Sequence, residues 1–209
     1  RNYEILRQLT FGFFCIASVV SIGLFSLITP FVRDIWLGPS YELGWGITVL
    51  CIVVLLVRIM GLPLSLVMGV TGLFEKEKNV GASSALLNLI VSLALVKPDG
   101  MAGVLLGTLL SYLLQIVYRY IIYFRDFLEM PGEALRYAQD IGEYLAVIAG
   151  EVLLMQKIVP LVYGAGGMLL FCVCFLLCIA IPLLLDLVIF GRGWRLQSII
   201  TMVKGMRKA

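Results

Sequence analysis

Six long apolar stretches dominate the sequence and limit what the chain can fold into. A helix needs about 20 predominantly apolar residues to cross a bilayer, and each stretch approaches or exceeds that length. None alternates apolar and polar residues in the manner of a membrane β-barrel strand. We therefore predict an all-α, polytopic transmembrane helical bundle with six spans, at 9–31, 45–74, 80–96, 101–124, 141–163 and 166–190.

The composition excludes several classes of protein. Hydrophobic residues make up 61% of the chain and charged residues 14%, whereas soluble domains are about half apolar and a quarter charged. This excludes an ordinary soluble domain, a disordered tail and a nucleic-acid-binding domain. The chain has no histidine, which excludes His-metal sites and Ser-His triads. The five cysteines lie inside apolar stretches, which is typical of buried residues rather than disulfides or metal ligands; they are Cys15, Cys51, Cys172, Cys174 and Cys178.

The basic residues are unevenly divided between the two ends of the spans. Of the 16, twelve fall in the N-terminal segment, the tail and the connections after the second and fourth spans. The opposite connections contain two, Arg33 and Lys97, and two more, Arg58 and Lys157, lie within spans. Because basic residues are retained on the cytoplasmic side, we predict that both ends of the chain are cytoplasmic. The outer connections, at 32–44, 97–100 and 164–165, are too short for an external catalytic domain.

The polar connections divide the chain into four parts. Pro131 predicts a short interfacial helix within the longest connection, and the charged cluster at 75–78 predicts a solvated turn. The tail has a basic amphipathic pattern, which favours a topology anchor on the inner leaflet over a specific lipid site. We therefore expect a four-span region at 1–124, a cytoplasmic connection at 125–140, the last two spans at 141–190 and the tail at 191–209.

Two spans contain small residues at every fourth position. That spacing lets neighbouring helices approach closely in a membrane, so we predict close helix contacts along both stripes. The stripes are Gly103, Gly107 and Ser111 on the fourth span, and Gly142, Ala146 and Gly150 on the fifth.

Ionisable residues inside spans are costly and therefore mark functional sites. The candidates for substrate binding or coupling are Arg58, Glu151, Lys157 and Asp186. Arg58 and Glu151 lie at similar depth, and we hypothesise that they face a shared polar interior, either as functional groups or as a structural ion pair. Lys157 and Asp186 lie near span ends and favour snorkelling to the surface. Asn88 favours a bond to a neighbouring helix over a ligand.

The sequence contains no motif of a phosphate-binding loop, a paired-carboxylate site or a metal centre. We therefore expect a protein that is not an enzyme, with no catalytic residue, cofactor or metal.

Four stretches together resemble the bacterial polysaccharide flippases. They are 30–38 followed by Tyr41, 71–74, 85–96 and 100–108, in the order and spacing of the C-terminal portion of that family. These flippases transport O-antigen or capsular repeat units and belong to the multidrug, oligosaccharidyl-lipid and polysaccharide exporter superfamily. Some relatives carry an Arg-Asp pair just before the Gly-Leu-Phe of 72–74; Met68 and Gly69 stand there in this chain, so that polar site is not carried over.

The resemblance implies a MATE-like, two-lobe transporter of the bacterial plasma membrane, of which this chain, beginning at Arg1, would be the C-terminal portion. Its substrate would be an undecaprenyl-diphosphate-linked oligosaccharide, moved to the outer leaflet by alternating access, and its partners membrane lipids and polysaccharide-assembly proteins. The last two spans would line a groove for the lipid tail. Arg58 is the residue that we expect to attract the diphosphate, and Glu151 is the candidate for ion coupling.

Other functions remain open at this point. Within the superfamily, a lipid II flippase or a drug/cation antiporter would have the same span pattern. A polysaccharide polymerase or ligase is disfavoured by the short outer connections, and a scaffold subunit by the two charges in mid-membrane.

Overall fold

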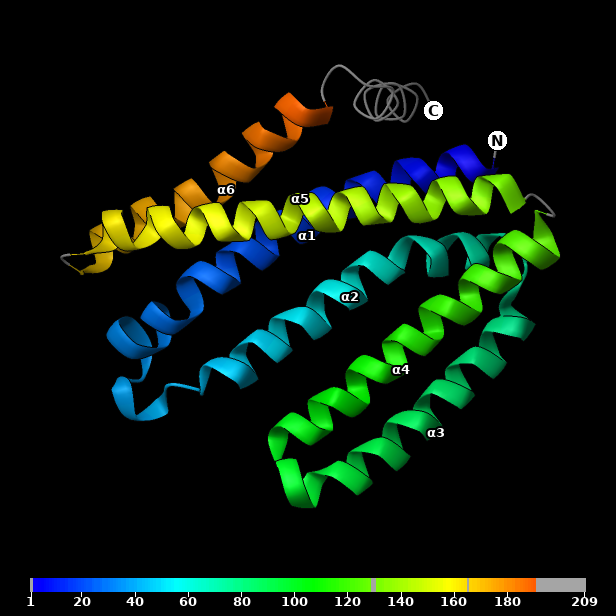
Figure 1. The fold of residues 1–209 in the computed structure, drawn as a ribbon, viewed down its shortest axis with the longest axis horizontal. Coiled ribbons are helices and arrows are strands. Elements are labelled where there is room, and N and C mark those ends of the chain that lie inside the picture. Colours follow the sequence, from blue (N-terminus) through cyan, green and yellow to red (C-terminus); the bar gives the residue numbers. More distant parts are fainter. Residues whose placement is uncertain (1, 129–130, 165, 191–209) are drawn as a thin grey trace. The chain divides into compact units, whose positions relative to one another are not determined.

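The computed structural model describes residues 2–128, 131–164 and 166–190. These residues form helices joined by short turns, without a strand among them (Figure 1). The elements are α1 (Asn2–Pro30), the π-helical turn η1 (Phe31–Trp36), the 3-10 turn η2 (Pro39–Tyr41), α2 (Trp45–Val70), α3 (Phe74–Asp99), α4 (Met101–Ile121), the π-helical turn η3 (Ile122–Phe127), α5 (Pro131–Tyr163) and α6 (Met168–Phe190).

Six of these helices are long and apolar enough to cross a membrane. This confirms the predicted number of spans and the all-α class, because only helices and closed barrels satisfy every backbone group inside lipid. The chain is thus a multi-pass helical membrane protein. The predicted tail at 191–209 lies outside the described residues.

Two polar segments differ from their sequence prediction. The cluster at 75–78 is the first part of α3 rather than a turn. Residues 131–140 are continuous with the fifth span in α5 and do not form a separate interfacial helix. In both places the backbone continues its i→i−4 hydrogen bonds beyond the apolar window, since polar side chains are compatible with a helix that leaves the membrane.

The described helices form two compact units, which are described separately. The first comprises the residues up to Leu6 together with Gly44–Glu143, and the second comprises Arg7–Leu43 with the described residues from Tyr144 on. The first unit therefore contains α2, α3 and α4, and the second contains most of α1 and α5 with all of α6.

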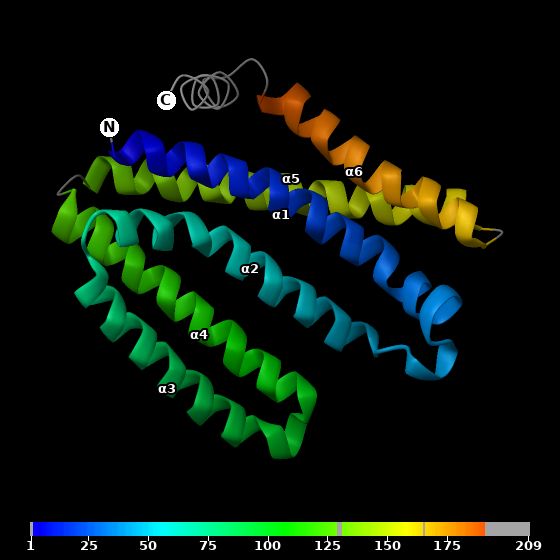
Figure 2. The same ribbon diagram turned by 180° about the vertical axis from the view of Figure 1, so that it is seen from behind.

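In the first unit, α3 and α4 form a tight hairpin and run side by side in both ribbon views (Figures 1 and 2). The turn between them is Gly100, whose φ of 55° favours glycine. Gly103, Gly107 and Ser111 are buried on α4, so the predicted close approach along this stripe is confirmed. A Cβ on Gly103 would collide with the backbone of Leu95 on α3.

Polar side chains join the two helices of this hairpin along most of its length. Asn88 bonds to neighbouring polar groups as the sequence predicts, which is how membrane helices satisfy polar groups buried away from water. The bonds between α3 and α4 are Asn88–Thr108 at 3.5 Å, Gln115–Ser84 at 2.8 Å and Arg119–Glu77 at 2.8 Å. Lys76 of α3 bonds to Asp126 of η3 at 2.9 Å, and Ser92 donates to Asn88 within α3 at 2.8 Å.

The second stripe of small residues does not make the predicted contact. A Cβ on Gly142 or Gly150 would meet no atom within 4 Å, and both glycines are exposed. That prediction is wrong for the described residues, because the spacing of small residues indicates what a helix face permits and not which helix covers it.

In the second unit, α1, α5 and α6 pack together through an apolar core and an aromatic cluster. The core comprises Ile22, Leu27, Met155, Val159, Cys174 and Cys178. The aromatic cluster comprises Phe11, Phe14, Tyr144 and Phe190, with the rings of Phe14 and Tyr144 stacked at 4.5 Å.

Candidate functional site

The first candidate site is a small cavity between α2 and α4 in the first unit. Arg58 lies near the middle of α2, is exposed, and donates a hydrogen bond of 3.3 Å from Nη1 to the hydroxyl of Tyr112 on α4. Its Cζ is 5.8 Å from the centre of the Tyr112 ring, within range of a cation–π contact. The cavity has a volume of about 190 Å³, room for several water molecules.

The charge of this cavity comes from Arg58. Ser65, Gln115 and Arg119 also contribute polar groups to its walls. Arg119 is ion-paired with Glu77 on α3 through both carboxylate oxygens, so its charge is balanced. Among the described residues, no carboxylate pairs with Arg58, and the cavity therefore carries one unbalanced positive charge.

The second candidate site is a pair of buried carboxyl groups in the second unit. Glu151 on α5 is 4% exposed, and Asp186 on α6 is 3% exposed. The hydroxyl of Ser18 on α1, which is fully buried, donates a hydrogen bond of 2.7 Å to Oε2 of Glu151. Oε1 of Glu151 and both carboxyl oxygens of Asp186 have no hydrogen-bond partner in the described structure. Three helices thus bring two carboxyl groups and one hydroxyl to the same region.

Apolar layers close this carboxyl pair on both sides along the helices. Ser18 lies one turn after Phe14, Asp186 one turn before Phe190, and Glu151 two turns after Tyr144, so the aromatic cluster covers one side. The apolar core covers the other side, beginning one turn beyond Ser18 with Ile22 and one turn beyond Glu151 with Met155.

The structure separates the four predicted site residues into different settings. Arg58 bonds to Tyr112 in the first unit, and Glu151 bonds to Ser18 in the second, so the predicted Arg58–Glu151 pair stays a hypothesis. Lys157 is exposed on α5, as snorkelling requires. Asp186 is buried, and the expectation that it reaches the surface is wrong: its position near the end of α6 does not reveal that its face of the helix packs inward.

Sequence reasoning missed Ser18 and Tyr112. A serine within an apolar span is common in membrane helices, and a single tyrosine in the middle of α4 does not indicate which helix it faces, so neither carries a distinctive signal alone. Both lie at long sequence distance from the charged residue that they contact, 133 residues for Ser18 and 54 for Tyr112.

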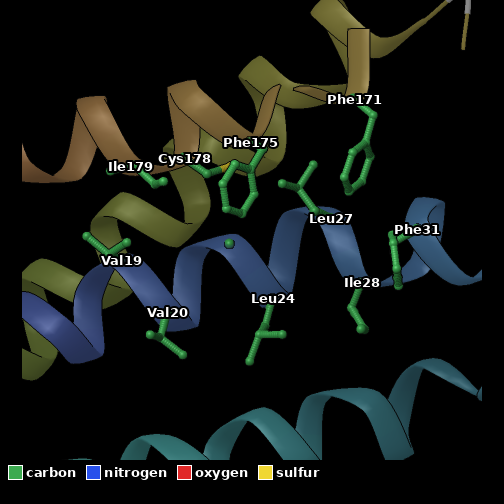
Figure 3. Close-up of a pocket in the computed structure, with 11 residues that line it drawn as sticks. Val19, Val20, Leu24, Leu27, Ile28, Phe31, Phe171, Phe175, Cys178 and Ile179 are labelled. Atoms are coloured by element: carbon green, nitrogen blue, oxygen red, sulfur yellow. The ribbon is translucent and has the colours of Figure 1, made fainter. Parts of the chain in front are cut away.

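An apolar groove runs between α1 and α6 in the second unit, with a volume of about 470 Å³ (Figure 3). Its walls are aliphatic and aromatic, with Cys178 as the one sulfur-containing side chain. The labelled residues on α1 include Leu24 and Leu27, Phe31 is the first residue of η1, and those on α6 include Phe171 and Phe175.

The described residues contain no group of three or more metal-ligating acidic or cysteine side chains. Comparison with known proteins gives no match to a family model, a curated protein or a solved structure. The fold and the two sites therefore define a multi-pass helical membrane protein with a cationic cavity and a buried carboxyl pair.

Proposed function

We propose that this chain is part of a flippase of the bacterial plasma membrane that moves a lipid-linked oligosaccharide repeat unit toward the outer leaflet. The substrate is an undecaprenyl-diphosphate-linked oligosaccharide used for cell-surface polysaccharide. Transport proceeds by alternating access between two MATE-like lobes, of which this chain supplies the C-terminal portion, with both of its ends in the cytoplasm.

The cavity at Arg58 carries the proposal. A guanidinium in the middle of a membrane span is costly beside lipid and stable beside water or an anionic ligand. Arginine binds phosphate groups through two parallel hydrogen bonds, and the hydroxyl of Tyr112 orients it by accepting a hydrogen bond at 3.3 Å. With Arg119 balanced by Glu77, the positive charge of Arg58 is the one that this cavity offers to a diphosphate.

The apolar groove supports a lipid-linked substrate. A polyprenyl chain is a long hydrocarbon, and a groove lined by aliphatic and aromatic side chains buries it favourably. The family resemblance places such a groove on the last two spans. Here α6 forms one wall as that resemblance implies, while the other wall is α1 rather than α5.

The test is complementation of a deletion strain with the full-length gene, measuring lipid-linked oligosaccharide in each leaflet and polysaccharide at the surface. The deletion should abolish surface polymer and leave the oligosaccharide on the inner leaflet. Arg58→Ala should reduce transport by about tenfold or more, because a charge-assisted hydrogen bond contributes about 1.5–3 kcal/mol. Arg58→Lys should be intermediate, since it keeps the charge and loses the two-pronged geometry.

The matched control is Lys76→Ala, which removes one positive charge from an exposed ion pair outside the cavity. It should transport normally. Accumulation of single repeats on the outer leaflet of the deletion strain would instead indicate a polymerase. Normal surface polymer in the deletion strain, with no second flippase present, would indicate a drug or cation exporter.

A further inference from the structure

We infer that Glu151 and Asp186, together with Ser18, form a proton-binding site within the second unit. Binding of the proton follows from the geometry of this unit. Its use to drive transport rests on the proposed flippase function, and the experiment below separates the two.

The first step of the argument concerns charge. Glu151 and Asp186 both lie between the aromatic cluster and the apolar core that α1, α5 and α6 share, and each is at least nine-tenths buried. Two negative charges in an apolar interior repel each other and lose their hydration, so such a pair is stable when it retains a proton.

The second step concerns counter-ions. Of the basic residues described in this unit, Arg33 pairs with Asp34 and Lys157 is exposed on another face of α5. Arg7 precedes Ser18 by eleven residues on α1, which is about 16 Å along the helix. None of these described cations is therefore placed to neutralise the carboxyl pair, and we infer that a proton supplies the positive charge.

The third step concerns the groups that face the pair from each helix. They are Ser18 on α1, Glu151 on α5 and Asp186 on α6, with Cys15 about one turn before Ser18 on α1. Ser18 donates its hydroxyl proton to Oε2 of Glu151 and so favours the ionised form of Glu151. Asp186, whose two carboxyl oxygens have no partner, receives no such support. The proton therefore resides mainly on Asp186, with Glu151 as its charged neighbour.

The fourth step concerns exchange of the proton. The aromatic cluster closes one side of the pair and the apolar core closes the other, so the proton enters or leaves only when one of these layers opens. Alternating access supplies such an opening on each side in turn, and the protonation state of the pair would follow the state of the transporter.

The experiment uses the full-length protein, purified without substrate and treated with dicyclohexylcarbodiimide, an apolar reagent that couples to protonated carboxyl groups in membranes. Mass spectrometry of its peptides should show modification of Asp186 that declines as the pH rises. Asp34, Asp126 and Glu77 each form an ion pair, and their lack of modification is the internal control. Asp186→Asn should lose the modification, and Ser18→Ala should extend it to Glu151.

Infrared spectroscopy of the same protein checks the result without requiring access of the reagent. The carbonyl band of a protonated carboxyl group should disappear at high pH and in Asp186→Asn. Absence of both the band and the modification over the whole pH range would overturn the inference. Modification of Asp186 that sodium blocks but that does not change with pH would also overturn it, because the pair would then be a metal-cation site.

Transport assays then separate the two proposals. Modification of Asp186 in a protein that does not move lipid-linked oligosaccharide would retain the proton site and refute the flippase. Normal transport by Asp186→Asn at every pH would show that a flippase does not use this proton, and would refute the coupling.

Discussion

Replacing Gly103 by alanine tests how closely α3 and α4 approach each other. The new Cβ would collide with the carbonyl group and Cβ of Leu95, and because the carbonyl belongs to a helix backbone, it cannot rotate away. Overpacking of this kind costs about 1–3 kcal/mol. Alanine also favours a helix over glycine by about 1 kcal/mol, which would hide part of the loss if the variant were compared with the wild type alone.

The matched control is Gly81→Ala on α3, an exposed helical glycine at which a Cβ would meet no atom within 4 Å. Helix propensity largely cancels between the two variants, so their difference measures the collision. Gly103→Ala should be less stable than Gly81→Ala by about 1–3 kcal/mol, or roughly 5- to 140-fold in the unfolding equilibrium.

The assay is reversible unfolding in mixed micelles, titrated with SDS and followed by circular dichroism. Equal midpoints for the two alanine variants would refute the close approach of the hairpin.

Further predictions concern the ion pairs and the end of α1. Glu77→Gln leaves Arg119 without its ionic partner, at a place where the Glu77 and Arg119 side chains are 24% and 13% exposed. The free energy of unfolding should fall by about 1–3 kcal/mol in the same titration, a loss between those typical of exposed and of buried ion pairs. Lys76→Ala breaks an ion pair in which the lysine is 48% exposed, and the free energy of unfolding should fall by less than about 1 kcal/mol. Equal losses of stability in Glu77→Gln and Lys76→Ala would contradict the argument from burial. Tyr163→Phe removes the hydroxyl that donates to Asp34 at 3.0 Å, and should speed hydrogen exchange in η1, whereas unchanged exchange would show that this bond does not hold the turn.

Hydropathy predicts the number of spans because every residue of a span lies in the same apolar environment. The composition of a short stretch of sequence is therefore enough to identify a span. The helix ends are less predictable. Glu77 belongs to a cluster that reads as a solvated turn, yet α3 includes it and its carboxylate pairs with Arg119 on α4. A charge pattern read along the chain does not include a partner that lies 42 residues away.

Packing faces are predictable where the partner helix follows directly in sequence. The stripe of Gly103, Gly107 and Ser111 starts immediately after a short turn, so α3 is its natural partner, and the contact is present. Gly142 and Gly150 have the same spacing on α5, but a Cβ at either would meet no described atom within 4 Å. Small residues permit an approach, and chain connectivity decides whether it occurs.

The candidate sites depend on information that depth along a span does not contain. Counting residues places Arg58 and Glu151 at similar depth but gives neither the direction of each side chain nor the helix that it faces. Asp186 shows the consequence most clearly: nearness to a helix end favours a surface position, whereas packing of α6 buries it beside Glu151. Once two carboxyl groups share an apolar region without a cation, electrostatics requires a proton or another ligand, whatever the substrate of the protein is. The chemistry of the site thus follows from the meeting of α1, α5 and α6, which no single span encodes.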